Sequence, residues 1–334
     1  MTALETPTLA HVARLANVSE NTVSRVIRDK GAIAPETRRR VIEAIDALGY
    51  VPNRAAGSLA SSSSMIVGVI LPSLSNIVFP ELLRGIHAGL AGTSYQPMIG
   101  VTDYDLEKEQ QLISSLLAWQ PAAIITTGFD HTDAARRMLE ASKVRVGELM
   151  DIDRRPIDLA VGLSHRGAGR AMARHLTRRG YSKIAYVGHD WDADRRAHAR
   201  YLGLCEGLGD VGLALVAEHR VDGPSSTLSG RQALAAILAD GAEIEAVAFS
   251  NDDMAVGGYL HCLAAAVPVP DRLALMGFNG LEIGQALPKP LATVLSNRFA
   301  IGKTAVETLL KSPDRAFEPA IIDTGFSIID GATA

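Results

Sequence analysis

Several features that define whole classes of protein are scarce or missing in this sequence. Its 334 residues include two cysteines, Cys205 and Cys262, which lie far apart and lack the Cys/His spacing of a zinc site. No apolar run approaches the roughly 20 residues that span a bilayer. The N-terminus lacks the basic start, apolar run and cleavage site of a secretory signal. We therefore expect reduced thiols, no bound metal, no membrane partner and a cytoplasmic location.

Familiar catalytic and nucleotide-binding motifs are missing as well. The apolar run 65–71 is followed by neither a GxGxxG motif nor a P-loop lysine, and the chain contains no GxSxG elbow. The adjacent carboxylates of NDDMA (251–255) point apart on a helix and do not suit a shared metal ion. His131, His165 and His189 are scattered and pair with no nucleophile. The sequence therefore predicts neither an enzyme nor a bound cofactor.

What the chain does contain is an ordinary globular composition, with 47% apolar and 21% charged residues. A length of 334 residues suits two or three compact units better than one core. The net charge of −4 is unevenly spread: residues 1–60 carry eight Lys/Arg and six Asp/Glu (+2), which leaves 25 and 31 (−6) for the remainder. The difference is small, but its sign favours an anionic partner for an N-terminal module.

The stretch TLAHVARLANVSENTVSRVI begins with two short helical patterns. Thr8 is a suitable N-cap, and the apolar positions of 9–16 follow a period of 3.6 residues. Asn17 tolerates the left-handed conformation that ends a helix, and Ser19 can cap a second helix over about 20–28. Two short helices joined by three residues are typical of a helix-turn-helix.

A third helix is predicted from Pro35, a favoured first position, to about Leu48, with Gly49 at its end. Its core face is assigned to Val41, Ile42, Ile45 and Leu48. Three arginines at 38–40 lie near its start, and such a triplet is more often a solvated face than a phosphate clamp. A small helical bundle without a ligand is the alternative for this whole region.

The following segment, YVPNRAAGSLASSSS (50–64), predicts a conditional element. Asn53 can cap a short helix that reaches about Leu59, although Gly57 inside it costs roughly 1 kcal/mol relative to alanine. A helix this short is unstable alone in water, so we expect it to form only against a partner. The serine run 61–64 is a flexible linker. Such a segment would couple a DNA-reading module to the larger body.

These segments, together with IVGVILPSLSN (66–76), resemble the lactose-repressor (LacI/GalR) family of bacterial transcription regulators, and the similarity continues to the end of the chain. The resemblance implies a homodimer on double-stranded operator DNA, and therefore an association with the nucleoid. It places the recognition helices in two major grooves and the paired hinge helices in the central minor groove.

Individual residues match the family's DNA contacts by position. Glu20, Asn21 and Arg25 match the base-reading residues, where an arginine can donate two bonds to guanine and an asparagine can pair with adenine. A second set matches the backbone contacts and the wedge inserted into a base step: Thr37, Tyr50, Asn53 and Leu59. The alternatives are a solvated Asn21 and a Leu59 that packs on the larger body.

From Met65 onward, short apolar runs alternate with helical stretches. The predicted strands are 65–71, 96–102, 122–128, 144–150, 159–164, 183–189, 246–251, 273–279 and 291–295. Helical patterns lie between most of them, such as 79–91, 105–118, 166–178, 199–208, 228–239 and 299–310. This alternation predicts parallel sheets with helices on both faces, and ligands beyond the carboxyl ends of the strands. The strands are too many for one modest sheet.

The predicted fold is therefore an N-terminal all-α helix-turn-helix domain (1–52) with a hinge helix and linker (53–64), joined to a two-subdomain α/β core (65–334). The resemblance implies a periplasmic-binding-protein-like core that holds a ligand between its subdomains. In that family the chain crosses over three times, and we place the crossings near 162, 295 and 324. The first subdomain is then about 65–162 and 296–323, and the second about 163–295 and 324–331.

Polar residues near predicted strand ends mark the ligand cleft. Ser73, Thr102, Asn251 and Asn279 follow strands, and Phe79 begins a helix. Arg200 matches the family's arginine that pairs with bound sugars or carboxylates, which a guanidinium can grip through two bonds. For each of the others, and for Asp103, the alternative is a strand-end cap or turn former.

Four segments look most like the gluconate-repressor branch of the family: ELMD (148–151), which ends in the candidate Asp151, DLAVGL (158–163), SNDDMAVG (250–257) and GFNGLEIGQ (277–285). Asn279 stands where sugar binders commonly carry aspartate, and losing a negative charge beside an arginine favours an acidic ligand. The sequence thus predicts a repressor of genes for sugar-acid catabolism, for example of gluconate or ketogluconate. A small-molecule effector is expected to release this repressor from its operator. The alternatives are a sugar-binding protein without a regulatory role, a sugar-modifying enzyme, and a regulator whose ligand acts as corepressor.

Overall fold

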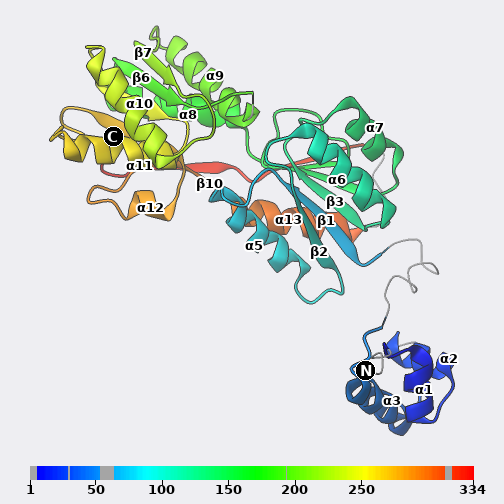
Figure 1. Cartoon of the computed structure of the whole chain (residues 1–334). Helices are drawn as coiled ribbons and strands as arrows, with labels where there is room; N and C mark the ends of the chain where they lie inside the picture. The colour runs from blue at the N-terminus through cyan, green and yellow to red at the C-terminus, as the bar shows by residue number, and fades with distance from the viewer. Residues whose placement is uncertain (1–5, 29–30, 53–63, 193, 313–317) are drawn as a thin grey trace. The chain divides into compact units, whose positions relative to one another are not determined.

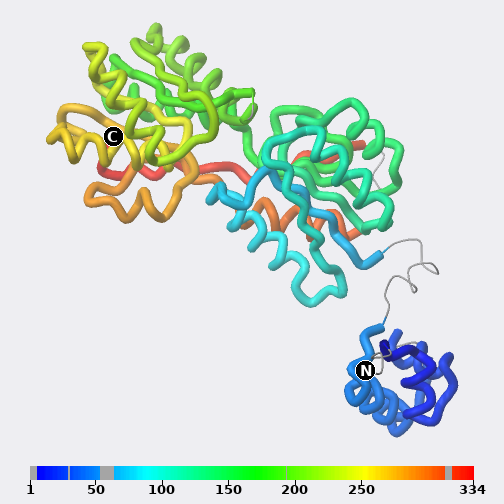
Figure 2. Tube along the Cα trace, in the orientation of Figure 1, coloured from blue at the N-terminus to red at the C-terminus, as the bar shows by residue number. Residues whose placement is uncertain are grey.

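The computed structural model describes residues 6–28, 31–52, 64–192, 194–312 and 318–334 (Figures 1 and 2). The chain divides into two compact units, Met1–Ser64 and Met65–Ala334. The described part of the first unit is helical, and the second combines parallel sheets with helices. The predicted fold class is confirmed for both units, while the predicted hinge helix lies outside the described residues.

The N-terminal unit holds three described helices: α1 (Leu9–Ala16), α2 (Glu20–Ile27) and α3 (Pro35–Leu48). The predicted capping residues end them. The Thr8 hydroxyl accepts a hydrogen bond from the backbone N–H of His11, and Asn17 adopts a left-handed φ of 53°. The Ser19 hydroxyl accepts from the backbone N–H of Thr22 at 3.2 Å. Short polar caps thus fix the turn between α1 and α2.

The core of this unit forms where the three helices meet, and one predicted core residue is wrong. Val41 and Ala44 of α3 are buried, and Ile45 packs partly against them. Ile42, which the sequence analysis assigns to the core face, is 46% exposed. It lies about 100° around the helix from Val41, outside the stripe formed by positions i, i+3, i+4 and i+7. The small Ala44 belongs to that stripe instead.

The second unit contains two six-stranded sheets with the same order of strands. The first sheet has the order β2-β1-β3-β4-β5-β11 with all neighbours parallel, and its strands are β1 (Ile66–Leu71), β2 (Gln96–Val101), β3 (Ala123–Thr127), β4 (Arg145–Leu149), β5 (Leu159–Gly162) and β11 (Ala320–Asp323). The second has the order β7-β6-β8-β9-β10-β12, and its strands are β6 (Ile184–Gly188), β7 (Ala217–Arg220), β8 (Ala246–Phe249), β9 (Ala274–Asn279), β10 (Ala292–Ser296) and β12 (Phe326–Ile329). The edge strand β12 runs antiparallel to β10.

Each sheet with its helices forms what we call a lobe (Figure 1). The first lobe carries α5 (Val78–Leu90), α6 (Leu106–Ala118), α7 (Asp133–Ala141) and α13 (Arg298–Lys311). The second lobe carries α8 (His165–Arg178), α9 (Arg195–Gly209), α10 (Thr227–Ala239), α11 (Asp252–Ala264) and the short α12 (Glu282–Gln285).

Both sheets are covered on both faces, because alternate side chains of a strand point to opposite sides. In β1, Val67, Val69 and Leu71 belong to the cluster that includes α5 and α13, whereas Ile70 belongs to the cluster with α6 and α7. The second sheet packs in the same way between the pairs α8/α9 and α10/α11. This double burial accounts for the continuous apolar runs that predicted the central strands.

The chain passes between the lobes after β5, after β10 and between β11 and β12. The nine strands predicted from the sequence all form, but three others were missed: β7, β11 and β12. Each has four residues, lies at a sheet edge and is partly exposed. β7 (AEHR) is mostly polar, and the four-residue patterns of β11 (AIID) and β12 (FSII) are too short to stand out as buried strands.

Glycines allow one helix pair in each lobe to approach closely. A Cβ atom added at Gly203 of α9 would lie 2.0 Å from the backbone oxygen of Arg166 in α8. In the first lobe, a Cβ at Gly85 of α5 would lie 2.1 Å from the backbone oxygen of Phe299 in α13. Since no such contact is tolerated, the backbone spacing of both pairs depends on glycine.

Candidate functional site

Helix α2 presents a polar surface formed by the side chains that the sequence analysis assigns to DNA. Glu20, Asn21 and Arg25 are exposed, while Val23 and Val26 anchor the opposite side of the helix in the core. The N-cap Ser19 sets Glu20 and Asn21 in the first turn. In a helix-turn-helix, this end of the second helix is the part that meets base edges.

The predicted backbone contacts have different surroundings. Thr37, in the first turn of α3, is half-buried, and Tyr50 packs partly against the core just after this helix. Asn53 and Leu59 lie outside the described residues. Arg39 of the arginine triplet is bound on its own helix to Glu36 (2.6 Å) and Glu43 (2.7 Å).

A second candidate site is a cavity in the larger unit, beside the carboxyl ends of β1 and β3. Both lobes contribute residues to its wall, which is formed by Ile70, Leu71, Pro72, Thr102, Tyr104, Leu106, Glu109, Thr127, Gly128, Asp130, Asp151, Asp194, Arg195 and Arg196. Such a position, outside the carboxyl ends of parallel strands, is where open α/β sheets bind ligands.

The two lobes give this cavity different chemistry. The first lobe supplies three carboxylates, Glu109, Asp130 and Asp151, and the second supplies both arginines together with one carboxylate, Asp194. Burial raises the pKa of Asp151, since the charged form loses hydration. Asp130 is held by Arg154 of its own lobe, with 2.7 Å between oxygen and nitrogen. The wall can therefore both accept hydrogen bonds and attract an anion.

The arginine side of the cavity is built at the start of α9. Asp194 caps this helix through a bond from the backbone N–H of Ala197. Burial would raise the pKa of Asp194, but the charge of Arg196 and a bond from His189 hold it well below the usual range. The Arg196 guanidinium lies 3.6 Å from Asp194 and 5.8 Å from the centre of the Phe79 ring. Among the described residues, its buried Nη1 atom has no hydrogen-bond partner.

Of the residues predicted for the ligand, Thr102 and Asp151 line the cavity, and Phe79 is fully buried beside Arg196. Ser73 caps a turn by accepting bonds from the backbone N–H groups of Ser75 and Asn76. Asp103, the alternative turn former, adopts a φ of 55° and binds Lys108 on the surface at 2.8 Å.

Arg200 lies one turn further along α9 and does not form part of the cavity wall. Its Nη1 donates to Nδ1 of His165 (3.0 Å), its Nη2 donates to the carbonyl of Ser250 (3.1 Å), and it lies 4.2 Å from the centre of the Phe278 ring. The His165 Nε2 donates to the carbonyl of Met150 (2.7 Å), so this imidazole is neutral. Burial and the nearby Arg200 charge lower the pKa of His165 well below its usual range.

The two predicted asparagines also have local partners. The Asn251 side chain caps α11 by accepting from the backbone N–H of Met254 at 3.1 Å. Asn279 has a φ of 122°, and its carbonyl accepts a bond from Arg298. Neither residue is part of the cavity wall, and both are buried.

Five charged residues of the cavity wall were not predicted from the sequence: Glu109, Asp130, Asp194, Arg195 and Arg196. Asp130 comes soon after β3, so the strand-end rule that selected Thr102 could have found it. Arg196 precedes Arg200 by one helical turn and therefore shares its face of α9. Glu109 sits inside α6, where only the packing of that helix against the sheet decides that it reaches the cavity.

Two negative findings concern the described residues alone. They contain no group of three or more His, Cys, Asp and Glu side chains arranged to hold a metal ion. None of their helices is long and apolar enough to cross a membrane.

A helix-turn-helix unit followed by a core of two parallel-sheet lobes defines a DNA-binding transcriptional regulator with a binding-protein-like core. Residues 8–53 match the model for bacterial regulatory proteins of the lacI family, and residues 173–333 match the periplasmic binding protein-like domain. The HTH-type transcriptional regulator GntR of Pseudomonas aeruginosa is 37% identical over 97% of this chain and 94% of its own length. The chain belongs to the lacI family.

Solved structures agree with this assignment. A LacI family transcriptional regulator from Silicibacter pomeroyi is 41% identical and superposes with a TM-score of 0.92 over 98% of this chain and 99% of its own. The lac repressor dimer bound to operator and an anti-inducer is 25% identical, with a TM-score of 0.87 over 98% and 99% of the two chains.

Proposed function

We propose that this regulator represses genes of sugar-acid catabolism and leaves its operator when an aldonic acid, such as gluconate or a ketogluconate, binds the cavity. The GntR name of the relative that matches over nearly the full chain supports this ligand class. The protein would act at the nucleoid, in the cytoplasm, as a DNA-binding homodimer without catalytic activity.

The proposal rests on one observation: Arg196 of the second lobe and the carboxylates of the first lobe line the same cavity. An aldonic acid has a carboxylate at one end and hydroxyl groups along its chain. The buried Nη1 of Arg196 lacks a hydrogen-bond partner among the described residues and suits the carboxylate. Asp130 and Asp151 can only accept when ionised, so they suit the hydroxyl groups. A neutral sugar would add no charge to the pair that Arg196 already forms with Asp194 at 3.6 Å, whereas a carboxylate can also bind the unpaired Nη1.

The DNA half of the proposal rests on the exposed face of α2. Asn21 and Arg25 carry the functional groups that distinguish adenine and guanine in the major groove. Two copies of this helix in a dimer would read two half-sites. We also propose that Asn53 and Leu59 belong to a hinge that forms on bent DNA. Ligand binding lowers operator affinity only if the ligand binds the DNA-free conformation more tightly.

The test begins with selection of binding sites for the purified full chain from a random duplex pool. Affinity for the selected site is then measured by fluorescence anisotropy at fixed salt, with D-gluconate, 2-ketogluconate, L-idonate or D-glucose added. We expect at least one acid to weaken binding about tenfold or more, the usual scale of allosteric coupling, and D-glucose to have no effect. If an acid makes DNA binding tighter, the ligand is a corepressor and not an inducer. If the selection yields no preferred DNA sequence, the protein is better explained as a binding protein without a regulatory role.

The variant Arg25→Ala sharpens the DNA test. If Arg25 reads a base, the variant loses discrimination at one position of the selected site, at a cost of about 1–3 kcal/mol. If it weakens binding to all duplexes equally and lowers the salt dependence, Arg25 is a phosphate contact and the base-reading role is wrong.

A further inference from the structure

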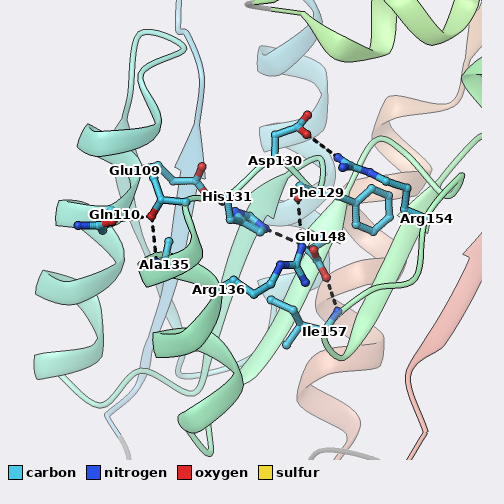
Figure 3. A network of polar contacts seen from close by, with 11 residues as sticks. Glu109, Gln110, Phe129, Asp130, His131, Ala135, Arg136, Glu148, Arg154 and Ile157 are labelled. Carbon is cyan, nitrogen blue, oxygen red and sulfur yellow. Dashed lines mark hydrogen bonds and ion pairs between the residues drawn. The ribbon is translucent and has the colours of Figure 1, made fainter.

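A buried chain of charges runs from the cavity wall into the first lobe (Figure 3). Glu109 of α6 lines the cavity and is 8% exposed. Its Oε1 lies 2.6 Å from Nδ1 of His131, and the Nε2 of the same ring lies 3.3 Å from Oε1 of Glu148 on β4. The far oxygen of Glu148 accepts from the backbone N–H of Ile157. The three side chains thus connect the cavity to the centre of the sheet.

The geometry fixes the charge of the middle member. Ionised carboxylates are acceptors only, so an imidazole between two of them must donate from both nitrogens. A ring that donates from both nitrogens is the imidazolium cation. Burial alone would lower the pKa of His131, but its hydrogen bonds to Glu109 and Glu148 outweigh this effect and raise the pKa to about 9. At neutral pH, His131 is therefore a fixed buried cation between two anions.

Of the two carboxylates that bind His131, only Glu109 can contact a ligand in the cavity. Glu148 is fully buried, and both of its oxygens are bound. Glu109 uses Oε1 for His131 and belongs to the cavity wall. A carboxylate held by a cation keeps its charge and orientation at little further entropic cost when a hydroxyl group arrives. Without the cation, the same carboxylate would lose the partner that fixes its orientation.

We infer that His131 is a positioning residue for ligand recognition, which holds the Glu109 carboxylate as an acceptor for a ligand hydroxyl group. This inference rests on the proposed function and adds to it that the first lobe selects hydroxyl groups through a built, charged acceptor. His131 touches no ligand itself. The effect passes through Glu109, and Glu148 supports the chain from behind.

The test compares variants of the full chain by calorimetric titration with D-gluconate at pH 7. Glu109→Gln weakens binding about tenfold, since a charged acceptor is lost. His131→Asn weakens it by a similar factor. The double variant is no weaker than Glu109→Gln alone, because both changes act through one carboxylate.

A matched control is available on the same strand. Arg145 of β4 and Asp158 form a buried ion pair at 2.7 Å that lies away from the cavity wall. Asp158→Asn lowers the melting temperature, as does His131→Asn, but its affinity for D-gluconate stays within about twofold of wild type. If His131→Asn does not fold, Glu148→Gln replaces it: this change removes one of the two groups that raise the pKa of His131, so affinity for D-gluconate should begin to fall at a lower pH than in the wild type. An unchanged pH profile would overturn the positioning role.

A pH series supplies a readout that a purely structural role would not move. The charged groups near His131 are Glu109 on α6, Glu148 on β4, Arg136 on α7, and the surface pair of Asp130 and Arg154. The wild-type affinity falls as pH rises through about 9, where His131 loses its proton. The ratio of wild-type to His131→Asn affinity shrinks over the same range.

The two proposals fail in different ways. If the wild type binds no aldonic acid, the proposed ligand class is wrong and this inference falls with it. If the wild type binds D-gluconate but His131→Asn and Glu109→Gln bind it within twofold, the ligand class stands and the positioning role is overturned. Additive losses in the double variant would also overturn it.

Discussion

The two lobes share one strand order but bring different charges to the cavity between them. The first lobe contributes Glu109, Asp130 and Asp151, whereas the second contributes Arg195 and Arg196 beside the cap Asp194. Since the strand orders match, we attribute the difference in charge to single side chains near strand ends and helix starts. The two lobes can therefore contact different parts of one ligand: the second lobe suits an anionic group, and the first lobe suits hydroxyl groups.

The largest effect on ligand affinity is expected when Arg196, a basic residue of the second lobe, is removed. Arg196→Ala should weaken D-gluconate binding about 100-fold, or roughly 2.7 kcal/mol, because a carboxylate would lose a charged, partly buried donor pair. Calorimetric titration measures the affinity. Arg231→Ala on α10 is the control, since this exposed side chain of the second lobe lies outside the cavity wall and its loss should cost no more than about twofold. An Arg196→Ala protein that binds within threefold of wild type would mean that the anion binds elsewhere.

The second prediction concerns two buried histidine side chains, His131 in the first lobe and His165 in the second, which have opposite charge states. His131 has a raised pKa of about 9, so its stabilising contribution is complete below pH 6.5 and is lost as pH rises through 9. The difference from the usual 6.5 corresponds to roughly 3 kcal/mol. His165 has a lowered pKa, so its contribution is present above pH 6.5 and is lost as pH falls below it.

Thermal unfolding of the full chain from pH 5 to pH 10 measures this contrast. In His131→Asn, the melting temperature should fall less than in the wild type as pH rises toward 10, and its dependence on pH below 6.5 should be unchanged. His165→Asn should do the opposite. Identical pH profiles for the two variants would show that the lobes do not hold their histidines in different charge states.

The third prediction tests what the lobes have in common. Gly85→Ala in the first lobe and Gly203→Ala in the second should each destabilise the fold by about 1–3 kcal/mol, because a methyl group would meet backbone atoms of the neighbouring helix. Gly209, at the end of α9, has nothing within 4 Å of an added Cβ. Gly209→Ala should therefore be neutral or stabilising by up to about 1 kcal/mol. Chemical denaturation compares the three, and equal effects at 203 and 209 would contradict close packing of α8 and α9.

The smallest effect is expected at Asp103, a carboxylate of the first lobe that is not part of the cavity wall. It is bound to Lys108 at the surface. Asp103→Asn should change D-gluconate affinity by less than twofold, since asparagine also tolerates the left-handed backbone at this position. A larger loss would extend the acidic side of the cavity to this turn.

Much of the fold could be predicted because its signals are local. Thr8 and Ser19 cap the starts of α1 and α2 through their side chains, and Asn17 ends α1 through its left-handed backbone. The central strands are buried on both faces and therefore read as apolar runs. The edge strands β7, β11 and β12 are exposed on one side or more, and their pairing is decided by distant partners.

The cavity could be predicted only in part. Thr102 and Asp151 follow strands, so topology alone brings them to the carboxyl edge of the sheet. Resemblance to the family predicts a ligand contact for Arg200, but in this chain its guanidinium is bound to His165 and Ser250 and is not part of the cavity wall. Arg196, on the same helix face, forms the wall instead.

The sequence by itself determined the helix-turn-helix, the alternation of strands and helices, and the residues available for DNA and ligand, because caps, periodicity and strand ends act over a few neighbouring positions. Only the tertiary structure decided that Glu109, His131 and Glu148 form one charged chain, although 22 and 17 residues separate its contacting pairs. Charge states in a protein interior depend on which groups the fold brings within hydrogen-bond distance, and no local pattern encodes that distance.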